Sequence, residues 1–128
     1  MIRQAGIWID HRSAFVVSID KGAETAERVD SGVEKRTGFS RGSTSEGSLA
    51  DDQRDRQFTV HLNNYYDKVI SHVRDAESIL LMGPGEAKGE FEKRLTSKGL
   101  GGRLVGVETV DKMTDHQIAA RVRQHYKT

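Results

Sequence analysis

Acidic side chains stand at the ends of predicted strands, where carboxylates could gather around metal ions. Asp10 directly follows one predicted strand, and Glu108 and Asp111 lie at the end of another. Ligands of open α/β sheets collect beyond the carboxyl ends of parallel strands, and clustered carboxylates there can hold the two metal ions of a nuclease. A metal-dependent nuclease using these three residues is one hypothesis, although turn chemistry and helix-dipole charge explain Asp111 equally well.

A glycine turn offers a second candidate site, this time for phosphate. Gly83-Pro84-Gly85 follows an apolar run and precedes a predicted helix that contains Lys88. Free N–H groups at a helix start bind anions, and Lys88 would add positive charge. The spacing matches neither the dinucleotide fingerprint nor the P-loop, so an ordinary strand-to-helix turn explains it as well. Gly83, Gly85 and Lys88 are therefore a candidate phosphate-binding turn.

A segment of about residues 34–56 has no hydrophobic periodicity and is predicted to be a flexible loop. Structureless stretches of about 20 residues are unusual inside a domain and are usually functional or disordered. A Gly/Ser/Arg loop can follow a phosphate backbone and become ordered on contact. Acidic residues balance the basic ones here, so a solvated, self-neutralising loop is the alternative. The candidate phosphate contacts are Lys35, Arg36, Arg41, Arg54 and Arg56.

The elements that would position these residues follow the order β-β-β-α-β-α-β-α. Alternating or continuous apolar residues predict strands at 5–10, 13–19, 25–33, 78–82 and 104–109. The third strand has few apolar residues and is expected at a sheet edge. Only His11 and Arg12 separate the first two strands, which implies a tight hairpin although these residues are not the type that such turns prefer.

Helical periodicity is clearest from Phe58 to Val73, where apolar residues form one stripe. A shorter helix is expected from about Ala87 to Leu95. Thr114 and Gln117 form a capping box before the last helix. Strands that return through helices run parallel, so we expect a mixed five-stranded sheet with helices on its faces. This order matches the ribonuclease H-like core.

Length and composition set further limits. The 128 residues suit one domain over 1–128, and the absence of cysteine excludes thiol chemistry, Cys-based zinc sites and iron–sulfur clusters. No apolar run approaches the about 18 residues that span a bilayer, and no signal-peptide core is visible, so a cytoplasmic location without membrane contact is expected. With a formal charge of +1, any nucleic-acid binding must come from local clustering of basic residues.

Two motifs carry a resemblance to a known family. The segment Gly6-Ile7-Trp8-Ile9-Asp10, and the run from Ile79 to Glu90 ending in Lys88-Gly89-Glu90, flank the aperiodic loop and the long helix. This arrangement resembles the middle domain of the archaeal and eukaryotic class-1 peptide release factor and of Pelota. The chain also resembles small bacterial proteins labelled translational machinery proteins, in the segment Val105–Asp111 and in Thr114-Asp115-His116-Gln117.

One departure from the release-factor pattern limits what the resemblance implies. In the release factor, the loop before the long helix carries Gly-Gly-Gln, which reaches the peptidyl transferase centre. Residues 35–47 of this chain contain no Gly-Gly-Gln, and Gly101-Gly102-Arg103 lies after the second helix. Peptidyl-tRNA hydrolysis is therefore not carried over. The resemblance implies ribosome or RNA association of the rescue or dormancy type, and we expect no catalytic residue, metal or cofactor.

Three hypotheses of function remain open from the sequence. The leading one is a non-enzymatic module that binds the ribosome or structured RNA through the loop at 34–56. The metal-dependent nuclease is the second. The third is a self-associating structural protein, in which the weak third strand pairs across a two-fold axis to give a homo-oligomer.

Overall fold

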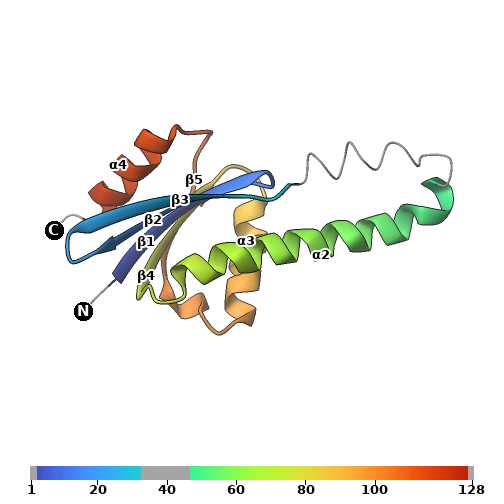
Figure 1. Ribbon diagram of the computed structural model, residues 1–128, viewed down its shortest axis with the longest axis horizontal. Helices are drawn as coiled ribbons and strands as arrows, with labels where there is room; N and C mark the ends of the chain where they lie inside the picture. Colours follow the sequence, from blue (N-terminus) through green and yellow to red (C-terminus); the bar gives the residue numbers. More distant parts are fainter. Residues whose placement is uncertain (1–2, 33–46, 127–128) are drawn as a thin grey trace.

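A mixed sheet of five strands lies at the centre of the fold, in the order β3-β2-β1-β4-β5 (Figure 1). The computed structural model describes residues 3–32 and 47–126, with side chains described for 3–32 and 60–126. The strands are β1 (Arg3–Ile9), β2 (Ser13–Asp20), β3 (Ala23–Asp30), β4 (Ser78–Gly83) and β5 (Leu104–Thr109). β1, β2 and β3 form an antiparallel meander, whereas β4 runs parallel to β1 and β5 runs parallel to β4. The predicted order and mixed sheet are confirmed.

Two tight turns make the antiparallel meander. Lys21 and Gly22 join β2 to β3 with φ of 55° and 82°, the positive values that a two-residue hairpin turn requires. The turn between β1 and β2 uses a side chain instead. The Asp10 carboxylate accepts hydrogen bonds from the N–H groups of Arg12 at 2.8 Å and Ser13 at 2.9 Å. Asp10 thus supplies the turn chemistry that His11 and Arg12 lack.

Helices cover both faces of the sheet (Figure 1). α2 (Gly47–Val73) and α3 (Ala87–Ser97) lie on one face, and α4 (Asp115–Tyr126) lies on the other. A short 3-10 helix, η2 (Gly101–Arg103), leads into β5. Each face has its own apolar core: Ile7 and Leu81 pack with the α2 and α3 side chains, whereas Trp8 and Met82 pack with those of α4. None of the helices in the described ranges has the length and apolar character that a bilayer crossing needs.

The boundary of the long helix was predicted wrongly. α2 begins at Gly47 rather than at Phe58, so residues 47–56, which we expected in the loop, are helical. This part of α2 projects beyond the sheet in Figure 1. A helix that covers no core needs no apolar stripe, and the good helix formers Leu49, Ala50 and Gln53 allow it to form without one.

At Gly83 the main chain of β4 lies too close to the end of β1 for a side chain. The φ of Gly83 is +154°, and a Cβ added there would lie 2.2 Å from the carbonyl oxygen of Ile9. Gly85 also has a positive φ, +63°, but open space surrounds it. We expect Gly83→Ala to lower the free energy of unfolding by about 2–4 kcal/mol, because backbone strain and a clash with a main-chain atom add together.

Gly85→Ala is the matched control, and its strained φ alone should cost about 1–2 kcal/mol. Urea denaturation followed by circular dichroism measures both variants. Equal losses of stability would mean that the close approach of β4 to β1 has no energetic weight.

Candidate functional site at the strand-end rim

The carboxyl ends of the three parallel strands meet at one edge of the sheet, which we call the strand-end rim. Trp8 of β1 pairs with Met82 of β4, and Gly83 pairs with Thr109 of β5. The N–H of Val110 continues the ladder by donating to the Gly83 carbonyl at 3.2 Å. The predicted common edge is therefore confirmed, and it is where an open α/β sheet binds its ligands.

The carboxylates predicted for a nuclease do not converge on this rim. The Asp10 carboxylate accepts hydrogen bonds from the main chain of the β1–β2 turn. Glu108 forms an ion pair with Arg121 of α4 at 2.7 Å. Asp111 contributes its main-chain carbonyl, which accepts a bond from the Trp8 indole at 3.3 Å. Within the described residues, no group of three or more His, Asp or Glu side chains could hold a metal ion, so the nuclease hypothesis lacks its site.

The Lys88 side chain lies beside the Gly83-Pro84-Gly85 turn. Lys88 donates from Nζ to the Gly85 carbonyl at 2.7 Å, which holds its ammonium over the turn that was predicted to bind phosphate. Glu86 occupies the N-cap position of α3 and makes no side-chain capping bond. The arrangement keeps positive charge beside a helix start, and phosphate binding by Gly83, Gly85 and Lys88 stays a prediction.

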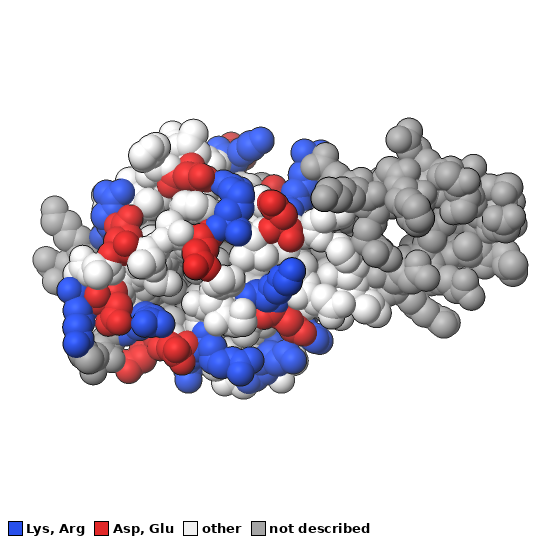
Figure 2. All heavy atoms as spheres, viewed as in Figure 1, with Lys and Arg blue, Asp and Glu red and all other residues white. Residues whose placement is uncertain are grey.

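The basic residues of the predicted loop fall outside what the structure describes. Lys35, Arg36 and Arg41 lie outside the described residues altogether. Arg54 and Arg56 lie in α2, but their side chains are outside the described ones. On the described face in Figure 2, acidic and basic side chains are interspersed rather than gathered by sign. This face as a whole therefore has no strong attraction for a polyanion such as RNA, and any attraction must come from small groups of basic residues.

A polar network at the rim was missed from the sequence. His11 and Glu90 form a contact of 3.0 Å between Nε2 and Oε1, and Tyr66 donates its hydroxyl to the same carboxylate oxygen at 2.7 Å. Tyr65 donates to the main-chain carbonyl of Asp10 at 2.9 Å. The network thereby joins the end of β1 to α2 and α3. We call the following set the rim network: Asp10, His11, Ser31, His61, Tyr65, Tyr66 and Glu90.

The rim network also joins the residue after β3 to the middle of α2. The Ser31 hydroxyl donates to the His11 carbonyl at 2.7 Å, and the Ser31 N–H donates to the Arg12 carbonyl at 2.8 Å. The imidazole of His61 contacts the Ser31 carbonyl. Ser31 lies just before the segment between β3 and α2, and His61 lies within the helix that follows it. The chain therefore leaves the rim and returns to it at two points that are bonded together.

Burial keeps the two tyrosine hydroxyls of the network protonated. Tyr65 and Tyr66 are 3% and 2% exposed. Desolvation raises the pKa of Tyr65, and the nearby Asp10 carboxylate raises it further. Desolvation also raises the pKa of Tyr66, with the hydrogen bond to Glu90 adding to it. Both hydroxyls therefore act as hydrogen-bond donors at neutral pH and above.

A groove between α2 and α3 opens beside the network and has a volume of about 530 Å³. Tyr66 and Glu90 line it together with Asn63 and Lys93. Below it, Asp67 accepts two bonds from the Arg94 guanidinium at 2.8 and 2.9 Å. That pairing lowers the pKa of Asp67 and fixes α3 against α2.

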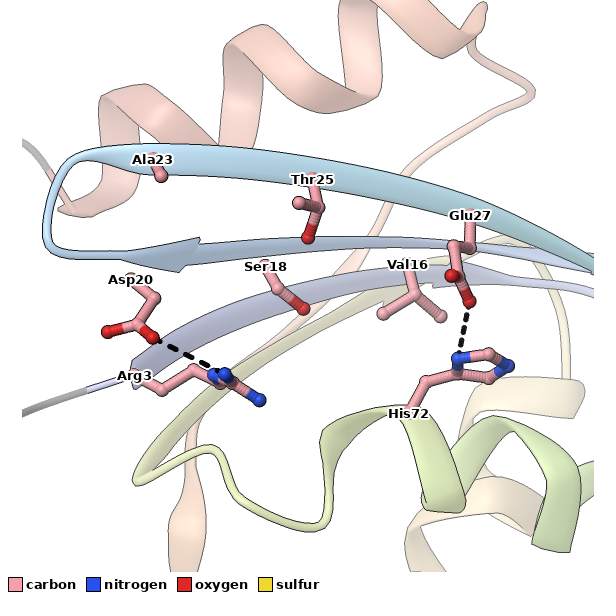
Figure 3. A pocket seen from close by; sticks show the side chains of 8 residues that line it. All are labelled: Arg3, Val16, Ser18, Asp20, Ala23, Thr25, Glu27 and His72. Atoms are coloured by element: carbon pink, nitrogen blue, oxygen red, sulfur yellow. Dashed lines mark hydrogen bonds and ion pairs between the residues drawn. The ribbon is translucent and has the colours of Figure 1, made fainter.

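A second cavity, of about 340 Å³, lies at the opposite end of β1 (Figure 3). Arg3 reaches Asp20 at 3.3 Å, and His72 of α2 reaches Glu27 of β3 at 2.6 Å. Figure 3 shows Ser18 between these two pairs. The Arg3–Asp20 pair thus joins β1 to β2, and the His72–Glu27 pair joins the end of α2 to β3.

The Tyr66 hydroxyl gives a direct test of the rim network. Tyr66→Phe should lower the free energy of unfolding by about 1–2 kcal/mol, because it removes one bond to a carboxylate without opening a cavity. Glu90→Gln should weaken both bonds that converge on this oxygen. The matched control is Glu92→Gln on α3, since the Glu92 side chain makes no polar contact among the described residues. Chemical denaturation measures all three, and equal effects of the two glutamine variants would contradict the network.

The tyrosines predict how stability responds to alkali. The pKa of Tyr126 is raised from 10.0 to about 12, chiefly by burial. The pKa values of Tyr65 and Tyr66 are raised as well. The unfolded tyrosines ionise near pH 10 while the folded ones stay protonated, so the folded state binds more protons above that pH. Stability should be unaffected by these groups below pH 10 and then fall by about 1.4 kcal/mol per pH unit for each tyrosine.

Denaturant unfolding at intervals from pH 8 to pH 11 measures this slope. Tyr126→Phe should remove the contribution of one tyrosine. A free energy of unfolding that stays constant above pH 10 would contradict the burial of these hydroxyls.

Comparison with known proteins supports the fold described above. The Pelota protein of Thermoplasma acidophilum is similar with a TM-score of 0.59 and 18% identity, over 96% of this chain and 32% of that chain. Pelota of Archaeoglobus fulgidus is similar with a TM-score of 0.58 and 11% identity, over 97% of this chain and 31% of its own. The archaeal translation termination factor aRF1 is similar with a TM-score of 0.55 and 13% identity, over 98% of this chain and 35% of that chain.

The chain spans about a third of the length of each of these proteins, as the coverage of 31–35% records. No protein-family model matches the chain, and no curated protein matches it in sequence. At identities of 11–18% the likeness establishes a common fold. The resemblance inferred from the strand and turn motifs is therefore confirmed as a fold: this chain has the architecture found in Pelota and in the archaeal release factor.

Proposed function

We propose that this protein is a non-enzymatic binding module of translation that associates with the ribosome or with structured RNA. The observation that supports the proposal is a fold shared with Pelota and aRF1 over 96–98% of the chain. Because a fold alone does not determine function, RNA binding also requires a surface suited to RNA. The segment that leaves the strand-end rim after β3 is that surface.

The composition of this segment suits a phosphate backbone. Arginine and lysine bind phosphate oxygens without reading sequence, and glycine and serine allow the backbone to adapt. The contacts to RNA would come from Lys35, Arg36, Arg41, Arg54 and Arg56. The contact between the Ser31 carbonyl and the His61 imidazole supports this role, because it fixes the residue before the segment to the middle of α2.

The same segment argues against release chemistry. Residues 35–47 contain no Gly-Gly-Gln, so the chain lacks the motif that a release factor brings to the peptidyl transferase centre. The proposed role is therefore that of a rescue or dormancy factor, which binds without hydrolysing peptidyl-tRNA.

Sedimentation with ribosomal particles tests the proposal. Run in sucrose gradients at several salt concentrations, the protein should co-sediment at low salt and dissociate as salt rises. Arg36→Ala/Arg41→Ala should weaken binding and reduce the slope of log affinity against log salt by about 0.7–0.9 for each lost phosphate contact. The control for a loss of charge alone is Lys21→Ala/Arg74→Ala, because it removes two positive charges at the opposite end of the sheet.

Ribonuclease treatment before the gradient separates RNA contacts from protein contacts. If the protein does not co-sediment at the lowest salt, or if both double variants lose the same affinity, binding through the segment is wrong.

A further inference from the structure

A polar cavity opens on the face of the sheet that α2 covers, at the end of β1 that lies away from the rim. It is the cavity of about 340 Å³ shown in Figure 3, lined by β1, β2, β3 and the last turn of α2. Val16 belongs to the core beneath α2, so Ser18 and Asp20 of the same strand face this side too. Ser18 pairs with Thr25 across the strands. Small side chains therefore form the floor of the cavity.

The two hydroxyls on this floor are available to a ligand. Within the part of the chain that the structure describes, the side chains of Ser18 and Thr25 make no hydrogen bond. Val16 and Ala23 line the same cavity and add apolar surface. Hydroxyls both donate and accept, and apolar neighbours suit the methylene groups of a ligand. The floor therefore fits a short aliphatic chain that carries polar ends.

One end of the cavity places opposite charges side by side. Arg3 donates from Nη2 to Oδ2 of Asp20 at 3.3 Å, and its ion pair with Asp75 is longer, 3.8 Å. The Arg3 and Asp20 side chains are 39% and 40% exposed. These contacts leave most N–H groups of Arg3 and Oδ1 of Asp20 without a partner among the described residues. An α-amino acid has the complementary arrangement, a carboxylate beside an ammonium group.

The other end of the cavity offers a carboxylate oxygen. Nδ1 of His72 lies 2.6 Å from Oε2 of Glu27, and Oε1 of Glu27 has no partner in the described ranges. Glu27 pairs with Val16, four residues before Asp20 on β2, so roughly 13 Å of strand separates the two ends. Figure 3 shows Ser18 and Thr25 between them. A cationic group at the end of an extended side chain would reach Glu27.

The mixture of charges selects the class of ligand. A simple anion would meet the carboxylates of Asp20 and Glu27, and a simple cation would meet the guanidinium of Arg3. Each would therefore face a like charge, which weakens binding. A ligand with an anionic and a cationic group at one end and a second cationic group at the other meets an opposite charge at every position. Basic α-amino acids have this pattern.

We propose that this cavity binds a free basic α-amino acid such as arginine. Arg3 binds the α-carboxylate, and Asp20 binds the α-ammonium group. Glu27 accepts hydrogen bonds from the guanidinium of the ligand, and His72 holds Glu27 in place. The methylene groups lie over the floor, between Ser18 and Thr25. In extended form, with a hydrogen bond of about 2.9 Å at each end, arginine matches the span of the cavity.

Calorimetric titration of the full chain with arginine and two analogues tests the ligand. Arginine should bind. Agmatine, which lacks the α-carboxylate, and citrulline, whose side chain is neutral, should each bind at least about tenfold more weakly, because each loses one charge-assisted contact. No binding at millimolar arginine, or equal affinity for all three compounds, would overturn the proposal.

Two glutamates of β3 provide a matched pair of variants. Glu27→Gln removes the charge inside the cavity and should weaken arginine binding at least about tenfold. Glu24→Gln removes the same charge from the other face of the strand, where Glu24 pairs with Arg123 of α4 at 2.8 Å, and should leave the affinity unchanged. Equal weakening by both variants would mean general charge attraction and would overturn the site.

Amide chemical shifts locate the bound amino acid without any substitution. In proton–nitrogen correlation spectra of the natural chain, arginine should shift the amides of Ser18, Thr25 and Glu27. Agmatine at the same concentration should shift them less. Shifts confined to α4, or spread evenly over the surface, would show adventitious association only and would overturn the assignment to this cavity.

Discussion

The pairing of β4 beside β1 is the constraint on which the other features depend. It requires a glycine at position 83, because a Cβ there would lie 2.2 Å from the Ile9 carbonyl oxygen. It also brings three strand ends to one rim. The same pairing sets α2 and α3 over a common face. Tyr66 of α2 and His11 after β1 can therefore reach one oxygen of Glu90 on α3. A different neighbour for β1 would separate these groups.

The polar groups of the strand-end rim bond to one another and hold neighbouring elements together. Its carboxylates are used locally: Asp10 shapes a turn, Glu108 pairs with α4, and Glu90 receives the tyrosine and the histidine. What the rim offers instead is a bonded junction between Ser31 and the helix that carries His61. This junction fixes the residue before the segment for which we propose RNA binding to the middle of α2.

Much of the fold could be predicted because its signals are local. Alternating apolar residues predicted β1 and β2, and one apolar stripe predicted α2 from Phe58. The Thr114–Gln117 capping box forms both of its expected hydrogen bonds: the Thr114 N–H donates to the Gln117 side chain at 2.9 Å, and the Gln117 N–H donates to the Thr114 hydroxyl at 3.2 Å. The start of α2 was missed because a helix outside the core has no stripe. The rim network was missed because His11 and Glu90 are 79 positions apart, and polar contacts between distant segments leave no periodic pattern. Asp10 was considered as a metal ligand in the nuclease hypothesis because, in the sequence, a carboxylate at a strand end looks the same whether it binds a metal or bonds to a turn.

Site-directed cross-linking to ribosomes tests the central claim most directly. In separate variants, Ser43→Cys places a photoactivatable group in the segment anchored at the rim, and Ala23→Cys places it at the hairpin beyond the opposite end of β1. If the segment binds RNA, position 43 should give cross-links to ribosomal RNA and position 23 should give none. Cross-links from position 23 alone, or equal yields from both, would contradict binding through the segment.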